Sequence, residues 1–290
     1  NLHVYTNGAV IDSQGFTTAV LSPLLATAGN GIYPSGGTLI ISSGGGDGYI
    51  GAPYVTVSGG SGSNALAIAT TSGGTVANVI ITCPGQNYAA GDNLSFAFTG
   101  GGAKTPASTY VYTLQAGDLA ANSAGGLTKL GAGTLTLSAA NTYAGGTTNT
   151  AGTLQLGNIA ALGATTSPLT VNAGTVNLNA NSPTIGSLSG TGGTITDNSA
   201  GAGVTTLTVG QSVDGTFAGV IANGSTKALS LVKQGAAKLT LSGVNTYTNT
   251  TISAGTLALS GSGSIASTNI LVSSGANFDV SAVSFTLGAG

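Results

Sequence analysis

Aspartates are the residues of this chain best suited to acid–base chemistry, and they are few and scattered. All seven acidic residues are Asp: Asp12, Asp47, Asp92, Asp118, Asp197, Asp214 and Asp279. Hydrolysis of a glycosidic bond normally uses two carboxyl groups roughly 5 to 10 Å apart. Asp197 and Asp214 are the one pair we consider, because they could lie on neighbouring layers of a repeating fold. We expect instead that both are solvated corner residues.

The remaining reactive side chains do not form a recognisable catalytic or metal-binding set. His3, the single histidine, lies at the start of the chain, which disfavours a Ser-His-Asp triad. Cys83, the single cysteine, leaves no disulfide within the chain and no cysteine-based zinc site, and we expect it in a buried strand. The stretch 44–48, Gly-Gly-Gly-Asp-Gly, is similar to a calcium-binding repeat but occurs once and with the wrong spacing. We therefore expect a protein that is not an enzyme and has no cofactor and no metal ion.

The composition is almost free of charge. The 290 residues include five Lys, seven Asp, and no Arg or Glu, so 4% are charged against about 25% in a typical soluble domain. Such a chain cannot form the basic patch that nucleic-acid binding needs. Its 50 Gly disfavour a helical bundle, and its 41% hydrophobic residues exceed what disordered chains carry. The sequence contains no run of 18 apolar residues of the kind that would predict a transmembrane helix. The chain begins at Asn1 without a signal peptide, so we interpret it as a mature or excised segment. Its single Cys, the absence of Met and its many Thr, Asn and Gly residues favour an extracellular protein.

Internal repeats determine the predicted architecture. The segment 127–143 aligns without gaps with 231–247, with identical residues at 11 of 17 positions, and Ala-Gly-Thr-Leu follows at 151–154 and 254–257. A shorter Gly-Thr-Leu, Gly-Thr-Val or Gly-Thr-Ile unit begins at Gly133, Gly152, Gly174, Gly193 and Gly255. Alternating hydrophobic residues after each Gly predict short strands with one buried face. Units of this length cannot bury that face alone, so the sequence predicts an all-β parallel β-helix in which stacked coils share one core.

The residues of this repeat also resemble a known family. The pattern Gly-Leu-Thr-Lys-x-Gly-x-Gly-Thr-Leu-Thr-Leu-Ser-x-x-Asn-Thr-Tyr at 126–143 is similar to the autotransporter-associated β-strand repeat of bacterial passenger domains. The copy at 231–247 departs from it at Gln234 and Ala237. This resemblance covers roughly residues 123–290. It implies a secreted, right-handed β-helix at a bacterial cell surface, with an adhesive or structural role.

The segment before the repeats has a different composition and predicts a separate module. We expect residues 1–35 to form the first coil and N-terminal strands, 36–122 to form an inserted Gly/Tyr-rich β-module, and 123–290 to form the β-helix repeats. Tyr49, Tyr54 and Tyr88 follow or precede Gly-rich turns in the module. Their rings could stack on sugars or on a neighbouring subunit. The alternative is that they fill the core of a module that has few Leu.

A β-helix with uncharged ends presents unpaired strand edges, which favours association. We expect assembly strands around Leu2 and Val4 at one end and around Val283, Phe285 and Leu287 at the other. Contacts between these ends would be head-to-tail and would build an open extracellular filament, fibre or sheath in which the partner is a second copy of the chain. The alternative is a monomeric surface adhesin whose module binds glycans or another surface.

Overall fold

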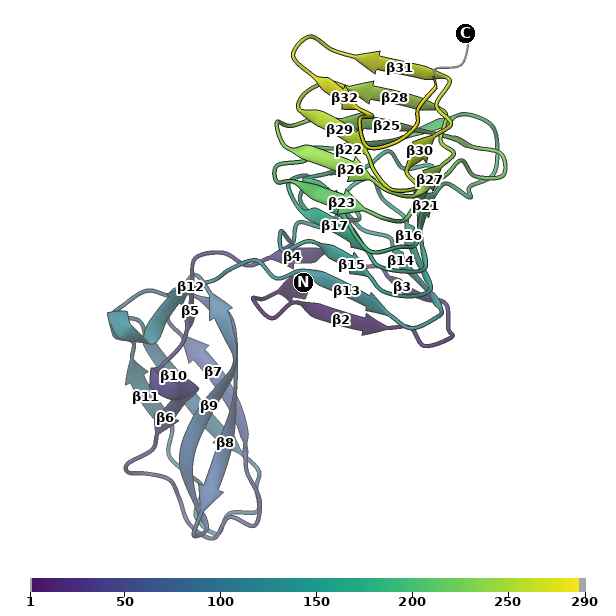
Figure 1. Ribbon diagram of the computed structural model, residues 1–290. Helices are drawn as coiled ribbons and strands as arrows, with labels where there is room; N and C mark the ends of the chain where they lie inside the picture. The colour runs from purple at the N-terminus through teal and green to yellow at the C-terminus, as the bar shows by residue number, and fades with distance from the viewer. Residues whose placement is uncertain (1, 287–290) are drawn as a thin grey trace. The chain divides into compact units, whose positions relative to one another are not determined.

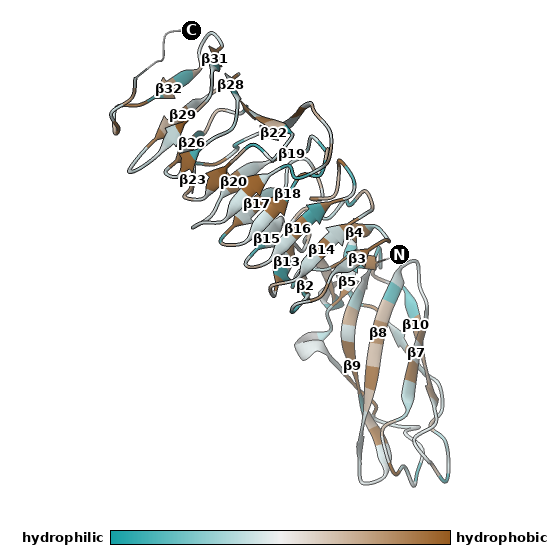
Figure 2. Cartoon of the chain, turned by 90° about the vertical axis from the view of Figure 1, so that its right-hand side faces the viewer, coloured by the Kyte–Doolittle hydropathy of each residue, from teal (hydrophilic) through white to brown (hydrophobic). Residues whose placement is uncertain are grey.

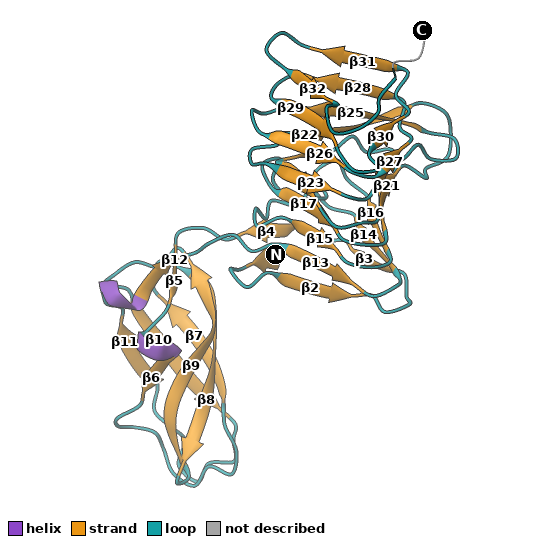
Figure 3. Ribbon diagram, viewed as in Figure 1, coloured by secondary structure: helices purple, strands orange, loops and turns teal. Residues whose placement is uncertain are grey.

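Short β-strands make up nearly all the regular structure of the chain (Figure 3). The computed structural model describes residues 2–286. Two compact units are present: Asn1–Ala26 together with Ala124–Gly290, and Thr27–Ser123. The helical elements among the described residues are two single 3-10 turns in the second unit, η1 (Ser35–Gly37) and η2 (Ala116–Asp118). The first unit is the β-helix, and we call the second the inserted module.

Three faces of parallel strands form the β-helix (Figure 1). The first face consists of β2 (Ala9–Asp12), β13 (Leu127–Leu130), β15 (Thr147–Asn149), β17 (Pro168–Val171), β20 (Ser187–Ser189), β23 (Gly215–Phe217), β26 (Lys238–Leu241), β29 (Thr256–Leu259) and β32 (Asn277–Asp279). The second consists of β3 (Thr18–Val20), β14 (Thr134–Leu137), β16 (Thr153–Leu156), β18 (Thr175–Asn177), β21 (Thr194–Thr196), β24 (Val220–Ile221), β27 (Val244–Asn245) and β30 (Ser264–Ile265). The third consists of β19 (Thr184–Ile185), β22 (Val204–Val209), β25 (Ala228–Lys233), β28 (Asn249–Ile252) and β31 (Asn269–Val272). The predicted all-β parallel β-helix is therefore confirmed.

Ladders of identical or similar apolar side chains fill the interior of the β-helix. Leu135, Leu154, Val176 and Ile195 lie in register on successive layers of the second face, and all four are fully buried. Burial of each such side chain contributes about 2 kcal/mol. The alternation of apolar and polar residues within each Gly-Thr-Leu unit therefore places one apolar ladder after another in a continuous core.

Glycine is required where successive corners stack backbone against backbone. Gly152 has a φ of 62°, and a Cβ atom placed on it would lie 2.4 Å from the carbonyl oxygen of Gly133 in the layer before. A Cβ atom on Gly174 would lie 2.2 Å from the carbonyl oxygen of Gly152. A side chain at either position would force the layers apart, which explains why Gly opens the repeated unit.

The two long sequence repeats do not occupy the same faces. The first repeat begins in β13 on the first face and continues in β14 on the second. The second begins in β25 on the third face and continues in β26 on the first. The repeat therefore specifies a local strand–corner–strand conformation, and not a fixed position around the β-helix axis.

Residues 2–26 form the first layer of the β-helix. Strand β1 (Leu2–Val4) pairs in parallel with β4 (Leu24–Ala26), and β2 and β3 pair directly with β13 and β14. The inserted module thus interrupts the chain between the first and second layers without interrupting the sheets.

The inserted module is a six-stranded antiparallel sheet. Its strand order is β11 (Tyr110–Thr113), β10 (Asn93–Thr99), β7 (Tyr54–Gly59), β8 (Ser63–Ser72), β9 (Thr75–Gln86) and β6 (Thr38–Ile40). Hydrophobic and polar segments alternate along β8 and β9 (Figure 2). Strand β5 (Asn30–Ile32) pairs with β12 (Leu119–Ala121) where the chain enters and leaves. With this pairing included, the unit begins at Thr27, whereas the start predicted from the sequence is residue 36.

Candidate functional site

The three tyrosines proposed for ligand contact have different environments. Tyr49 and Tyr88 are buried in the core of the module, and the Tyr49 hydroxyl accepts a hydrogen bond of 2.9 Å from the amide of Ala107. Burial raises the pKa of Tyr88. Both rings lie in the same buried cluster as the inward-facing alanines of β8 and therefore present little surface to another molecule. Tyr54 is 70% exposed.

The predicted assembly strands are engaged within the chain. Leu2 is exposed and Val4 is buried, and both lie in β1, which is paired with β4. Val283 and Phe285 are not in a strand; they pack, partly buried, against the β-helix core. The Phe285 ring meets Phe278 edge-on, with centroids 5.3 Å apart. The strand predicted there was therefore wrong for the described part, and Leu287 lies outside the described residues.

Asp197 and Asp214 do not form a catalytic pair. Asp197 is buried and accepts hydrogen bonds from the amides of Ala180 and Ser199 and from the hydroxyls of Ser199 and Thr205. Burial alone would raise the pKa of Asp197, but these hydrogen bonds hold it below its ordinary value. Asp214 is exposed and accepts a 2.8 Å hydrogen bond from the amide of Lys238. The two carboxylates stabilise different corners of the β-helix.

Other sites for chemistry are equally sparse. Within residues 2–286, no group of three or more His, Cys, Asp or Glu side chains could hold a metal ion. In the same range no helix is long and apolar enough to span a membrane. The imidazole Nδ1 of His3 lies 3.2 Å from the carbonyl oxygen of Ala26, a contact that supports the β1–β4 pair.

Two fully buried lysines form the most unusual polar sites of the β-helix. The Nζ atom of Lys129 donates hydrogen bonds to the carbonyl oxygens of Leu130 (2.9 Å), Gly131 (2.6 Å) and Ala151 (3.0 Å). The Nζ atom of Lys233 has equivalent partners in the second repeat, at 2.8, 2.8 and 3.0 Å: Gln234, Gly235 and Ala254. We call each arrangement a lysine cage.

Each lysine cage ties one layer of the β-helix to the next. Two of its carbonyl groups belong to the corner that follows the lysine, and the third belongs to the corresponding corner about one turn later. Burial lowers the pKa of both ammonium groups, and the nearby carboxylates of Asp12 and Asp214 act in the opposite direction. The three N–H groups are all used, so the cages are structural clamps and not nucleophiles.

Sequence reasoning missed these lysines, although a signal was available. Lys129 and Lys233 are the charged residues that both long repeats share, and each occupies an inward position, two residues after a core leucine. A charged residue at a core position of a repeat predicts a buried, fully hydrogen-bonded group.

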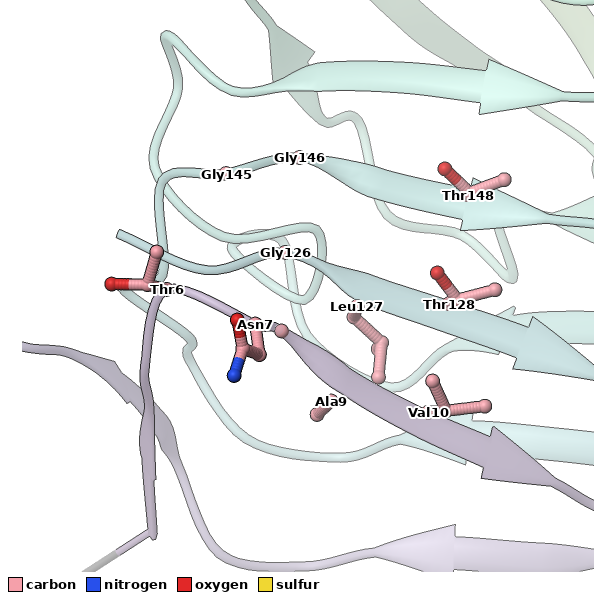
Figure 4. A pocket seen from close by; sticks show the side chains of 11 residues that line it. Thr6, Asn7, Ala9, Val10, Gly126, Leu127, Thr128, Gly145, Gly146 and Thr148 are labelled. Atoms are coloured by element: carbon pink, nitrogen blue, oxygen red, sulfur yellow. The ribbon is translucent and has the colours of Figure 1, made fainter. Parts of the chain in front are cut away.

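A shallow hollow lies on the first face beside the first layers (Figure 4). Its volume is about 220 Å³, and it is lined by uncharged residues: Thr6, Asn7, Gly8, Ala9, Val10, Gly126, Leu127, Thr128, Gly145, Gly146 and Thr148. Thr148, Thr128 and Val10 follow one another on successive strands. The hollow offers hydrogen-bonding groups but no general acid, base or metal ligand.

The two long repeats match a known family of protein repeats. The passenger-associated-transport-repeat family model matches residues 127–156 and 231–259. These repeats, together with the parallel β-helix, fit the autotransporter passenger-type β-helix repeat proteins. No curated protein and no solved structure matches it. Each passenger repeat contains one complete lysine cage, since Lys129 and Ala151 fall in the first match and Lys233 and Ala254 in the second. Passenger repeats of this kind indicate a secreted or surface-exposed protein.

Proposed function

We propose that this passenger domain displays the inserted module at the cell surface, where the module makes adhesive contacts while the β-helix serves as a structural support. The observation that carries the proposal is the direct pairing of the first and second β-helix layers across the insertion, through Ala9 with Leu127 and Leu135 with Thr18. The β-helix is continuous without the module, so the module is free to serve another purpose.

The distribution of polar groups supports this division of roles. In the β-helix the buried ionic groups, Lys129, Lys233 and Asp197, are satisfied by internal hydrogen bonds. The module carries exposed Tyr and Ile side chains on its sheet. We propose no catalytic activity for either unit.

The experiment that tests the proposal removes residues 27–123 and joins Ala26 to Ala124 through a short Gly-Ser linker. A short linker suffices because Val4 pairs with Ala26 and also accepts a hydrogen bond from the amide of Gly125. We expect the shortened passenger to keep its β-sheet circular dichroism and cooperative unfolding but to lose attachment to glycan-coated and abiotic surfaces. Undiminished attachment by a folded shortened protein would overturn the proposal.

Head-to-tail assembly into a filament is the second candidate function. Strands β2 and β3 are terminal in their sheets, as are β31 and β32, so each has one edge without a strand partner among residues 2–286. A net charge of −2 gives little repulsion between copies. Electron microscopy at rising concentration tests this: long uniform fibres support it, and isolated short particles at every concentration contradict it.

A further inference from the structure

One face of the module sheet is apolar and exposed to solvent. Along β8, Ala65, Ala67 and Ala69 point into the core, so Leu66 and Ile68 point outward, with 59% and 51% of their surfaces exposed. An antiparallel sheet with one solvated face normally presents polar residues there. We call the outward side of β6, β7, β8 and β9 the outer sheet face.

Strand pairing makes the apolar residues of the outer sheet face contiguous. Tyr54 of β7 is opposite Ile68 of β8, which is opposite Ile80 of β9, which is opposite Thr38 of β6. On one side of this row Leu66 is opposite Cys83. Directly opposed side chains on one face of a sheet contact each other, so the row forms a single patch.

The other side of the row combines polar and apolar residues and is uncharged. Asn78 is opposite both Thr70 and Ile40, and its amide donates a 3.1 Å hydrogen bond to the Thr70 hydroxyl. Ile40 is 71% exposed.

The outer sheet face also has no charged side chains. The six strands of the sheet contain no Lys and no Asp. The charged residues of the module lie outside these strands: Asp47, Asp92, Lys104 and Asp118. A charged partner, such as a nucleic acid or an anionic membrane, would therefore gain no attraction here.

We propose that the outer sheet face is a self-association surface, on which the same face of a second copy packs sheet against sheet. This proposal rests on the proposed function, because it identifies the partner of the displayed module. Two such faces bring no like charges together and bury matching Ile, Leu and Tyr side chains, as the inner faces of a β-sandwich do. A two-fold axis allows one patch to serve both copies. Three of its four most exposed large side chains, Leu66, Ile68 and Ile40, are aliphatic, which favours a protein sheet over a carbohydrate.

The size of the patch predicts weak pairwise binding. Tyr54, Leu66, Ile68 and Ile40 expose on the order of 500 Å² per copy, below the roughly 800 Å² per partner of a stable complex. It is nevertheless at the upper end of the patches that monomers expose. A single pair of modules should therefore dissociate readily, while many copies on two opposed surfaces should hold together by avidity.

The test compares the full chain with two single variants. Ile68→Asp places a charge in the centre of the outer sheet face, and Val213→Asp places the same charge at a comparably exposed residue of the β-helix. Sedimentation velocity over a concentration series should show self-association of the wild type, at least tenfold weaker association of Ile68→Asp, and unchanged association of Val213→Asp. A bis-maleimide that joins Cys83 residues should capture wild-type dimers and few Ile68→Asp dimers. Circular dichroism checks that both variants fold.

Two results would overturn the inference. The first is a wild-type chain that stays monomeric in solution and does not cause beads densely coated with it to clump. The second is an Ile68→Asp variant that associates as strongly as the wild type. Failure of the proposed function would look different. If the shortened chain lacking 27–123 still attaches to surfaces while Ile68→Asp abolishes self-association, the proposed function fails and this inference stands.

Discussion

In the β-helix, the ionic groups of Lys129, Lys233 and Asp197 are buried and fully hydrogen-bonded, whereas in the inserted module the charges lie outside the strands and one sheet face exposes Ile and Leu. Both regions have the same charge-poor composition. The β-helix uses its few charges to fix one layer to the next, and the module leaves apolar surface available. This difference is the basis of our proposal that the repeats supply stability and the module makes contacts with other molecules.

The largest expected effect comes from a lysine cage. Lys129→Ala removes three N–H donors, so the carbonyl groups of Gly131 and Ala151 lose their lysine hydrogen bonds, while that of Leu130 keeps its hydrogen bonds from Ser13. We expect a loss of about 3 to 5 kcal/mol in the free energy of unfolding, measured by chemical denaturation of the full chain. Lys238→Ala is the matched control, since Lys238 is exposed in the same β-helix and should cost less than about 0.5 kcal/mol. Equal costs would contradict the structural role of the cage.

The next effect separates corner stacking from backbone strain. Gly152 and Gly261 have φ values of 62° and 61°, but a Cβ atom at Gly152 would lie 2.4 Å from a carbonyl oxygen, whereas one at Gly261 would meet no atom within 4 Å. Gly261→Ala should cost about 1 kcal/mol through strain alone. Gly152→Ala should cost about 3 kcal/mol because the layers must also separate. Thermal unfolding of both variants measures the difference, and identical melting temperatures would show that the corners do not stack as described.

A third effect depends on pH. The pKa of Asp197 is lower in the folded chain than in the unfolded chain. The ionised carboxylate therefore makes its full contribution to the free energy of unfolding above about pH 5. As the pH falls, the unfolded carboxyl group protonates first, near pH 4, and the contribution disappears as the pH passes through the lower folded pKa. Asp197→Asn should therefore cost about 2 kcal/mol at pH 7 and clearly less at pH 3.

Asp214→Asn is the control for this pH effect, because Asp214 is exposed and makes one hydrogen bond. Asp214→Asn should lower the free energy of unfolding by less than Asp197→Asn does at pH 7. A cost of Asp197→Asn that does not change between pH 7 and pH 3 would contradict the hydrogen-bonded, ionised carboxylate.

The smallest effect on stability is expected on the outer sheet face. Ile68→Asp should change the free energy of unfolding by less than about 0.5 kcal/mol, because more than half of the side chain is already in water. Leu154→Ala in the β-helix core should cost about 3 kcal/mol. Denaturant titrations of both variants check this contrast. A large loss in Ile68→Asp would mean that the face is part of the folded core and not a contact surface.

The β-helix could be predicted because its determinants are local. Alternation in each unit and Gly at each corner, as at Gly133 and Gly152, specify a strand and a turn within a few residues. The matching of units one turn apart then follows from burial of the apolar face. The same local signals could not predict that the second long repeat would be shifted by one face, because this depends on the lengths of all the intervening corners.

The module and the buried lysines could not be derived in the same way. The boundary at Thr27 depends on pairing between β5 and β12, which are separated by the whole module. Tyr49 and Tyr88 are buried in a cluster whose other members come from several strands of the module. Burial of Lys129 depends in part on the carbonyl group of Ala151, which lies in the next layer. In each case the deciding contact lies far away in sequence.

Hydrogen exchange of the full chain over a concentration series tests most directly whether the module makes the contacts. We expect concentration-dependent protection confined to β6, β7, β8 and β9, with no change in the β-helix strands. Protection that arises instead along the terminal strands β2, β3, β31 and β32 would contradict it and would place the contacts at the ends of the β-helix.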